Sequence, residues 1–90
     1  MSRAQVSYDD FARELGLNLL RAREAKGWSQ ERVAHAAGLS GYTYQKFEKG
    51  ESRPGSPMNP RLTTLLALAQ VLETTVEELL PVRRPDVAGY

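Results

Sequence analysis

The segment from Gln30 to Lys49 constrains the fold of this chain more than any other part of it. Its pattern predicts a helix of about eight residues and a helix of about ten, joined across the tripeptide Gly38-Leu39-Ser40. Ser29 and Ser40 supply the N-caps of the two helices. A turn this short does not let two helices lie antiparallel and is typical of a pair that crosses steeply.

The side chains around this turn suit such a crossing. Ala34 is small where two backbones must approach closely, and Gly38 can adopt a positive φ without steric cost. An apolar seam between the two helices is supplied by Val33, Ala37, Leu39, Tyr44 and Phe47. We therefore expect the two helices to pack directly on each other.

Two further helices carry clear end signals. The first begins at the cap Ser7 and ends near Lys26, with apolar residues recurring at a period near 3.6. The last begins at the cap Thr75, which stands three residues before Glu78 in the spacing of a capping box. Pro81 ends it.

One more helix follows a segment rich in proline and glycine. Residues 51–60 hold too much of both for a helix or a central strand, so they predict a loop. Asn59 as cap and Pro60 at the first helical position then open a helix. No stretch alternates like a strand, and the chain is expected to be all-α with five helices.

Composition indicates the size of the domain and the cellular location of the protein. Ninety residues, of which 41% are hydrophobic, suit one domain at 8–80, with an N-terminal arm at 1–7 and a C-terminal tail at 81–90. Cysteine is absent, and no apolar run is long enough for a signal peptide or a membrane span. We expect a cytoplasmic protein with no membrane partner.

Positive charge is concentrated in the middle of the chain. Residues 21–61 carry eight basic and four acidic side chains, whereas residues 1–20 and 62–90 are each net negative. The whole chain has a formal net charge of only +1. Because a local field matters more to a polyanion than the total charge, this pattern favours a basic face, although ordinary solvated helices give the same counts.

Two motifs give the chain a resemblance to a known family. Residues 23–31, REAKGWSQE, are similar to the family pattern "R-x-x-K-G-hydrophobic-S-Q-E", and residues 47–50, FEKG, to "hydrophobic-E-x-G". Over residues 11–80 the chain resembles the helix-turn-helix domain of the Cro and phage-repressor type, often called the XRE family. The resemblance implies a compact five-helix, lambda-repressor-like domain. The sequence departs from the family pattern at Tyr44, where an aliphatic residue is usual, and at residues 51–60, where the loop is longer.

The resemblance also implies how double-stranded DNA would be bound. The third helix would enter the major groove, where Lys46 can donate to guanine and Gln45 can pair with adenine. The residues expected to read or approach bases are Tyr42, Gln45, Lys46 and Gly41. Those expected to bind phosphates are Gln30, Thr43, Lys49 and Arg53. Those with structural roles are Arg23 and Glu48, which form an ion pair, with Ala34 and Gly38. The alternative is an ordinary solvated helix face.

These features favour a sequence-specific DNA-binding transcriptional regulator, a repressor that binds a palindromic operator as a homodimer. Alternatives on the same fold are an antitoxin-type protein that binds a toxin and autoregulates its operon, and a protein-interaction adaptor. An adaptor would carry acidic or apolar residues where Lys46 and Lys49 stand. Leu17 and Leu20 lie off the main apolar stripe of the first helix, and they mark a partner surface or a seat for the N-terminal arm.

No catalytic or metal-binding motif is present. His35 is the only histidine, and without cysteine or a matched carboxylate cluster it does not make a metal site. It also lacks a recognisable serine or cysteine nucleophile beside it. We therefore expect no cofactor, no metal and no enzyme activity.

Overall fold

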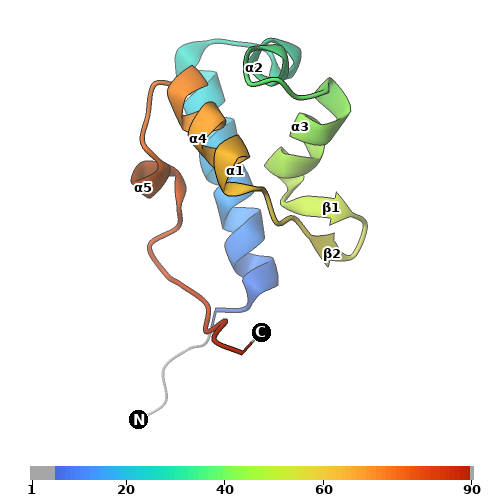
Figure 1. Ribbon diagram of the computed structural model, residues 1–90, viewed down its shortest axis with the longest axis vertical. Helices are drawn as coiled ribbons and strands as arrows, with labels where there is room; N and C mark the ends of the chain where they lie inside the picture. The colour runs from blue at the N-terminus through green and yellow to red at the C-terminus, as the bar shows by residue number, and fades with distance from the viewer. Residues whose placement is uncertain (1–5, 90) are drawn as a thin grey trace.

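A computed structural model describes residues 6–89 of the 90-residue chain. These residues form α1 (Tyr8–Lys26), α2 (Gln30–Ala36), α3 (Gly41–Lys49), β1 (Glu51–Arg53), β2 (Ser56–Pro57), α4 (Leu62–Val71) and α5 (Val76–Leu79). The long helix α1 runs through the middle, with α4 crossing in front of it, α5 on one side and the α2–α3 pair on the other (Figure 1). The predicted five-helix architecture is confirmed, whereas most of the expected N-terminal arm lies outside the described residues.

The predicted helix starts form through local hydrogen bonds. The side chains of Ser7, Ser29, Ser40 and Thr75 each accept a bond from the backbone N–H three residues later. Gly50 ends α3 with a φ of +77°, a left-handed conformation that glycine adopts without strain. These helix ends were predictable because each depends on residues that are close in sequence.

The start of α4 differs from the prediction. Asn59 and Pro60 are not its cap and first residue: the N-cap is Arg61, without a side-chain hydrogen bond, and the helix begins at Leu62. The cause lies just upstream at Met58. Its backbone N–H donates to the Gly50 carbonyl, and its side chain is fully buried. This anchor keeps the chain extended past Pro60, and Arg61 still has a ψ of 151°.

The loop predicted at residues 51–60 instead contains a small antiparallel hairpin. Strand β1 pairs with β2 in the register Glu51 to Pro57 and Arg53 to Ser56, with an irregularity between the two pairs. Pro54 and Gly55 make the turn, a combination typical of type II turns, and Gly55 has a φ of +83°. A sheet of only two strands has no central strand, so the proline in β2 is tolerated.

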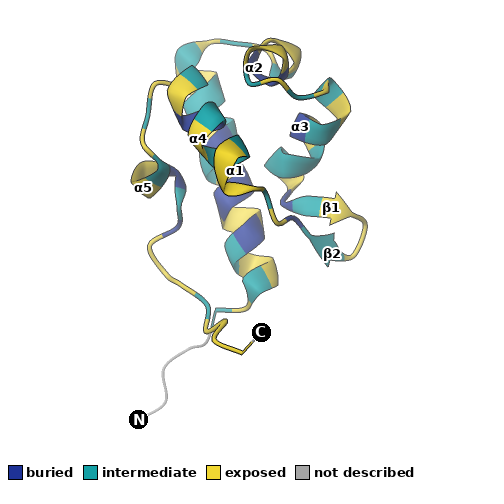
Figure 2. Ribbon diagram, viewed as in Figure 1, coloured by how far each residue is buried: buried dark blue, intermediate teal, exposed yellow. Residues whose placement is uncertain are grey.

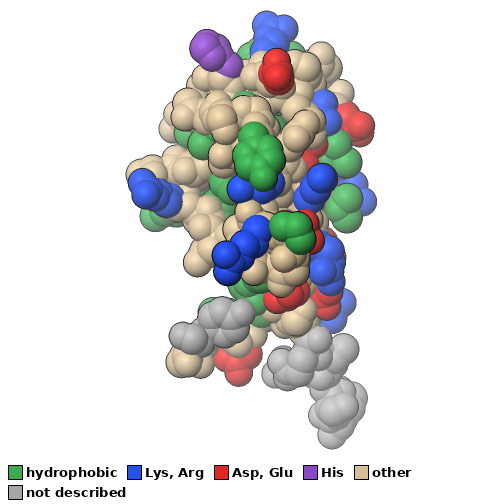
Figure 3. Space-filling view, turned by 90° about the vertical axis from the view of Figure 1, so that its right-hand side faces the viewer, with side chains coloured by type: hydrophobic (Ala, Val, Ile, Leu, Met, Phe, Trp, Pro, Cys, Tyr) green, Lys and Arg blue, Asp and Glu red, His purple; other side chains and the backbone are tan. Residues whose placement is uncertain are grey.

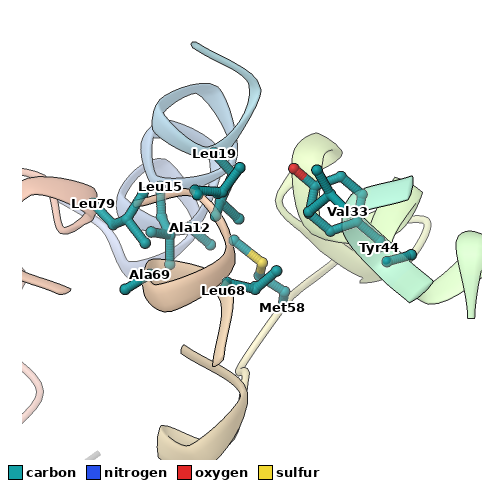
Figure 4. Close-up of a cluster of buried hydrophobic side chains, with 11 residues drawn as sticks. Ala12, Leu15, Leu19, Val33, Tyr44, Met58, Leu68, Ala69 and Leu79 are labelled. Atoms are coloured by element: carbon teal, nitrogen blue, oxygen red, sulfur yellow. The ribbon is translucent and has the colours of Figure 1, made fainter. Parts of the chain in front are cut away.

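The core lies between α1 and the other helices (Figure 2). Buried hydrophobic side chains come from all five helices and from the segment after β2: Ala12, Leu15, Leu19, Val33, Ala34, Tyr44, Met58, Leu68, Ala69, Leu72 and Leu79. Met58 sits between α1 and α4, while Val33 and Tyr44 pack together on the α2–α3 side (Figure 4). Met58, the residue after the hairpin, is thus part of the core and anchors the hairpin to the core.

Candidate nucleic-acid interface

Helices α2 and α3 meet at the turn that the sequence singled out. Gly38 has a φ of +77°, and the Leu39 N–H donates to the Ala34 carbonyl over 2.8 Å. Ala34 is 1% exposed and Val33 is fully buried, so the two helices are in direct contact at this point. The turn fixes α3 relative to α2 through both its backbone and its packing.

The C-terminal end of α3 rests on α1 at Gly16. A Cβ atom on this glycine would lie 2.6 Å from the backbone carbonyl oxygens of Phe47 and Glu48, closer than real Cβ atoms come. Gly50, just after α3, makes a similar contact, because a Cβ there would lie 2.6 Å from Arg13 Cα. Glycines therefore set how closely the last turn of α3 approaches α1.

A polar network behind α3 is centred on Glu48. Arg23 Nε donates to Glu48 Oε2 over 2.6 Å, and Arg23 Nη2 donates to Oε1 over 3.3 Å. Gln30 Nε2 donates to the same Oε1 over 2.7 Å, while Arg23 Nη1 donates to the Trp28 carbonyl over 2.9 Å. The ion pair implied by the resemblance is present, and it joins α1, the start of α2 and the end of α3.

The two charged side chains of this network are largely enclosed, and both remain ionised. The side chains of Arg23 and Glu48 are 15% and 6% exposed. Burial raises the pKa of Glu48, but Arg23, the nearby Tyr44 hydroxyl and Gln30 together lower it by more, so the pKa lies below its usual value. The hydrogen bond to Glu48 raises the pKa of Arg23. The pair is therefore ionised at neutral pH.

Tyr44 is buried beside this pair. Its side chain is fully enclosed, and its hydroxyl has no well-formed hydrogen bond to any of the described residues, although it lies close to Glu48. Burial first, and the neighbouring Glu48 carboxylate second, raise the pKa of this hydroxyl far above its usual value. The tyrosine therefore stays neutral and fills the place where the family usually has an aliphatic residue.

The opposite face of α3 carries the residues expected to read bases. Tyr42 is 71% exposed, Gln45 is exposed and Lys46 is half-buried. Tyr42 and Lys46 are one turn apart, and the Lys46 ammonium lies 4.6 Å from the centre of the Tyr42 ring. Figure 3 looks at this side, where Lys and Arg side chains lie across the middle of the face. Gly41 is half-buried at the start of the helix.

The residues expected to bind phosphates divide into two groups. Lys49 and Arg53 are exposed and have no hydrogen-bond or ion-pair partner in residues 6–89. Gln30 is tied to Glu48 through one amide hydrogen and keeps a second one for another acceptor. The Thr43 hydroxyl accepts a bond from Ser40 over 3.0 Å and can still donate its own hydrogen.

Comparison with known proteins identifies this arrangement. The family model of the helix-turn-helix domain matches residues 14–81. The chain belongs to the helix-turn-helix family. This helix-turn-helix protein has solved structural neighbours among regulators of the Cro and phage-repressor type, which confirms the resemblance found in the sequence.

Three neighbours illustrate the relationship. The restriction-modification controller protein C.AhdI from Aeromonas hydrophila is 32% identical, with a TM-score of 0.67, over 77% of the helix-turn-helix protein and 96% of its own chain. SinR, a master regulator for biofilm formation solved in complex with DNA, is 25% identical, with a TM-score of 0.62, over 72% and 95%. The P22 c2 repressor, solved with a synthetic operator, is 23% identical, with a TM-score of 0.64, over 73% and 91%. No curated protein matches the sequence.

Several residues that shape the site of the helix-turn-helix protein were not found by sequence reasoning. Gly16 stands inside the apolar period of α1, and only its interruption of a helix could have drawn attention to it. Glu31 of α2 lies over the start of α3, with its Cγ 3.4 Å from where a Cβ of Gly41 would be. Trp28 is half-buried and packs against the core, with the Arg32 guanidinium 3.9 Å from the centre of its ring.

Two other kinds of site are absent from residues 6–89. No group of three or more His, Cys, Asp or Glu residues there is arranged to hold a metal ion. None of the helices in this part of the chain is both long and apolar enough to span a bilayer. The solved neighbours named above are regulatory proteins, and two of them were determined in complex with DNA.

Proposed function

We propose that this chain is a sequence-specific DNA-binding transcriptional regulator, a repressor that binds a palindromic operator as a homodimer. The division of α3 into two faces carries the proposal. Tyr44 and Glu48 hold the helix from behind, while Tyr42, Gln45 and Lys46 face solvent and contribute little to the core. A rigid helix with polar side chains on its free face is what reading base edges in a major groove requires.

The phosphate contacts in this proposal come from the residues around that face. Lys49 supplies a free positive charge, and Gln30 supplies an amide donor that Glu48 holds in place. Such contacts fix the position of a protein on DNA, whereas base contacts specify the sequence. The two sets of residues should therefore differ in how their substitutions affect binding.

We expect Lys46→Ala to lose about 1–3 kcal/mol on a preferred duplex and to relax discrimination at one or two base pairs. Lys49→Ala should weaken binding to all duplexes alike and reduce the salt slope by about one unit, because one fewer counterion is released. Gln30→Ala should lower affinity without changing that slope. Fluorescence titrations against a duplex selected from random DNA and against a scrambled duplex, at several salt concentrations, measure these effects.

A matched control for the lysines is Arg21→Ala, which removes one charge from α1 on the side of α5. It should leave both affinity and salt slope close to wild type. If the variants of Lys46, Lys49 and Gln30 all bind both duplexes like wild type, the reading surface is elsewhere or DNA is not the partner. Such a result would favour a protein-interaction adaptor or an antitoxin-type protein instead.

Helix α4 supplies the surface that we assign to the homodimer. Its sequence, LTTLLALAQV, holds no charged residue, and Leu62 and Leu66 are 68% and 45% exposed. A two-fold interface places the same surface on both partners, so a helix without charge can face its own copy without repulsion. One domain buries little surface on DNA, and two domains with reading helices about 34 Å apart would bind successive turns.

We expect Leu66→Asp to prevent dimerisation and cooperative binding to a palindrome, since it places two like charges in the interface. Light scattering after size exclusion gives the mass, and titration of one-half-site and two-half-site duplexes gives the cooperativity. Leu17→Asp is the matched control, because Leu17 on α1 is 44% exposed. A monomer for Leu17→Asp and a dimer for Leu66→Asp would move the interface to the α1 side.

A further inference from the structure

The hairpin of β1 and β2 stands beside α3 and is held firmly at its base. Gly50 packs its backbone against α1, and the Met58 N–H donates to the Gly50 carbonyl over 2.9 Å. The Tyr8 hydroxyl donates to the Met58 carbonyl over 2.9 Å, and the Met58 side chain is fully buried. Both ends of the hairpin are therefore fixed to the core, so its tip is preorganised.

The hairpin projects away from α4 and α5, past the lower end of α3 (Figure 1). Its tip, Arg53 to Gly55, is exposed, and Arg53 has no partner among residues 6–89. Glu51, the acid of the hairpin, forms no ion pair with this arginine in the described part of the chain; it lines a small pocket together with Asp9 and Arg13 of α1. The hairpin thus presents one free positive charge.

We propose that the hairpin is a second DNA-reading element that places Arg53 in the minor groove next to the major groove occupied by α3. This inference rests on the proposed function. The centres of adjacent major and minor grooves are about 17 Å apart, half of the helical repeat of about 34 Å. Three residues of strand extend about 10 Å, and the arginine side chain adds its own length. The hairpin can therefore reach across one phosphate ridge.

An arginine in the minor groove has a defined preference. The narrow minor groove of A·T tracts has an enhanced negative potential that attracts arginine, and G·C pairs place an amino group in the way. Arg53 would therefore confer a preference for A·T pairs flanking the half-site, outside the bases that α3 reads. A contact to phosphate by the same residue would confer no preference.

Three duplexes separate these possibilities. Each carries the same central sequence, selected from random DNA, with flanks made of A·T, G·C or inosine·cytosine pairs. Inosine lacks the guanine amino group, so an I·C pair resembles A·T in the minor groove and G·C in the major groove. We expect wild type to bind the A·T and I·C flanks about tenfold more tightly than the G·C flanks. Arg53→Ala should bind all three equally, and Arg21→Ala should keep the preference.

Two results would overturn the inference. If Arg53→Ala weakens binding to all three duplexes by the same factor, Arg53 contacts phosphate only. If wild type binds the selected centre but ignores the flanks, or treats I·C like G·C, the hairpin does not read the minor groove. Failure of the selection to enrich any duplex would instead overturn the proposed function itself. Since Arg53 is exposed and without a partner, Arg53→Ala should unfold at the wild-type temperature, which shows that binding and not folding has changed.

Discussion

Glu48→Ala is expected to lower the free energy of unfolding by about 2–4 kcal/mol, because it leaves a mostly enclosed guanidinium without its counter-charge. Arg23 would lose both of its bonds to the carboxylate, and the amide of Gln30 would lose its acceptor. Removing one member of a buried pair costs more than never having had the pair. Chemical denaturation of the variant and of wild type measures the difference.

The control for this experiment is a solvent-exposed ion pair. Asp10→Ala breaks the pair between Asp10 and Arg13, whose side chains are 59% and 60% exposed, and should change stability far less. Equal losses for Asp10→Ala and Glu48→Ala would mean that the enclosure of the Arg23–Glu48 pair has no energetic consequence.

The lowered pKa of Glu48 adds a dependence on pH. A carboxyl group whose pKa is lower in the folded state stabilises the fold above its unfolded pKa, and this contribution is lost as the pH falls through the folded value. The stability difference between wild type and Glu48→Gln should therefore be constant near neutral pH and shrink below about pH 4.5. A difference that stays constant down to pH 3 would contradict the shifted pKa.

Gly16→Ala is expected to destabilise the fold by about 3 kcal/mol or more, although alanine favours an isolated helix over glycine by about 1 kcal/mol. The added methyl group would lie 2.6 Å from the carbonyl oxygens of Phe47 and Glu48, and these are backbone atoms that cannot rotate away. The last turn of α3 would have to move off α1. Denaturation in urea measures the loss.

Gly41→Ala is the matched control for this substitution. Gly41 is also helical, but its added Cβ would meet the flexible side chain of Glu31 at 3.4 Å, which is ordinary contact. This variant should be as stable as wild type or more stable, since it gains helix propensity. If Gly16→Ala behaves in the same way, the close approach of α3 to α1 is not needed for stability.

The helices of this fold could be predicted from sequence, whereas the hairpin could not. Ser7, Ser29 and Ser40 cap their helices through bonds to residues three positions away, and such signals are local. The hairpin instead depends on Gly50 and Met58, which are held by contacts with α1 that no local pattern records. The same anchor displaced the start of α4.

In the candidate site, too, features set by local sequence could be predicted, whereas contacts between helices could not. Helical periodicity was enough to sort α3 into an inward face with Tyr44 and an outward face with Tyr42 and Gln45. The bond from Gln30 to Glu48 was not predicted, because it crosses between two helices whose relative position sequence alone does not supply. Glu31 over Gly41 was missed for the same reason.

The division of α3 into two faces also bears on how such a protein changes over evolutionary time. Tyr44, Glu48 and the glycines beneath them hold the helix in place, and the solvent-facing side chains contribute almost nothing to that task. Substitutions at Tyr42, Gln45 or Lys49 therefore leave the fold nearly as stable as before. Successive single mutations can alter what this face binds while every intermediate remains folded, so a duplicated copy can acquire a new target without first acquiring extra stability.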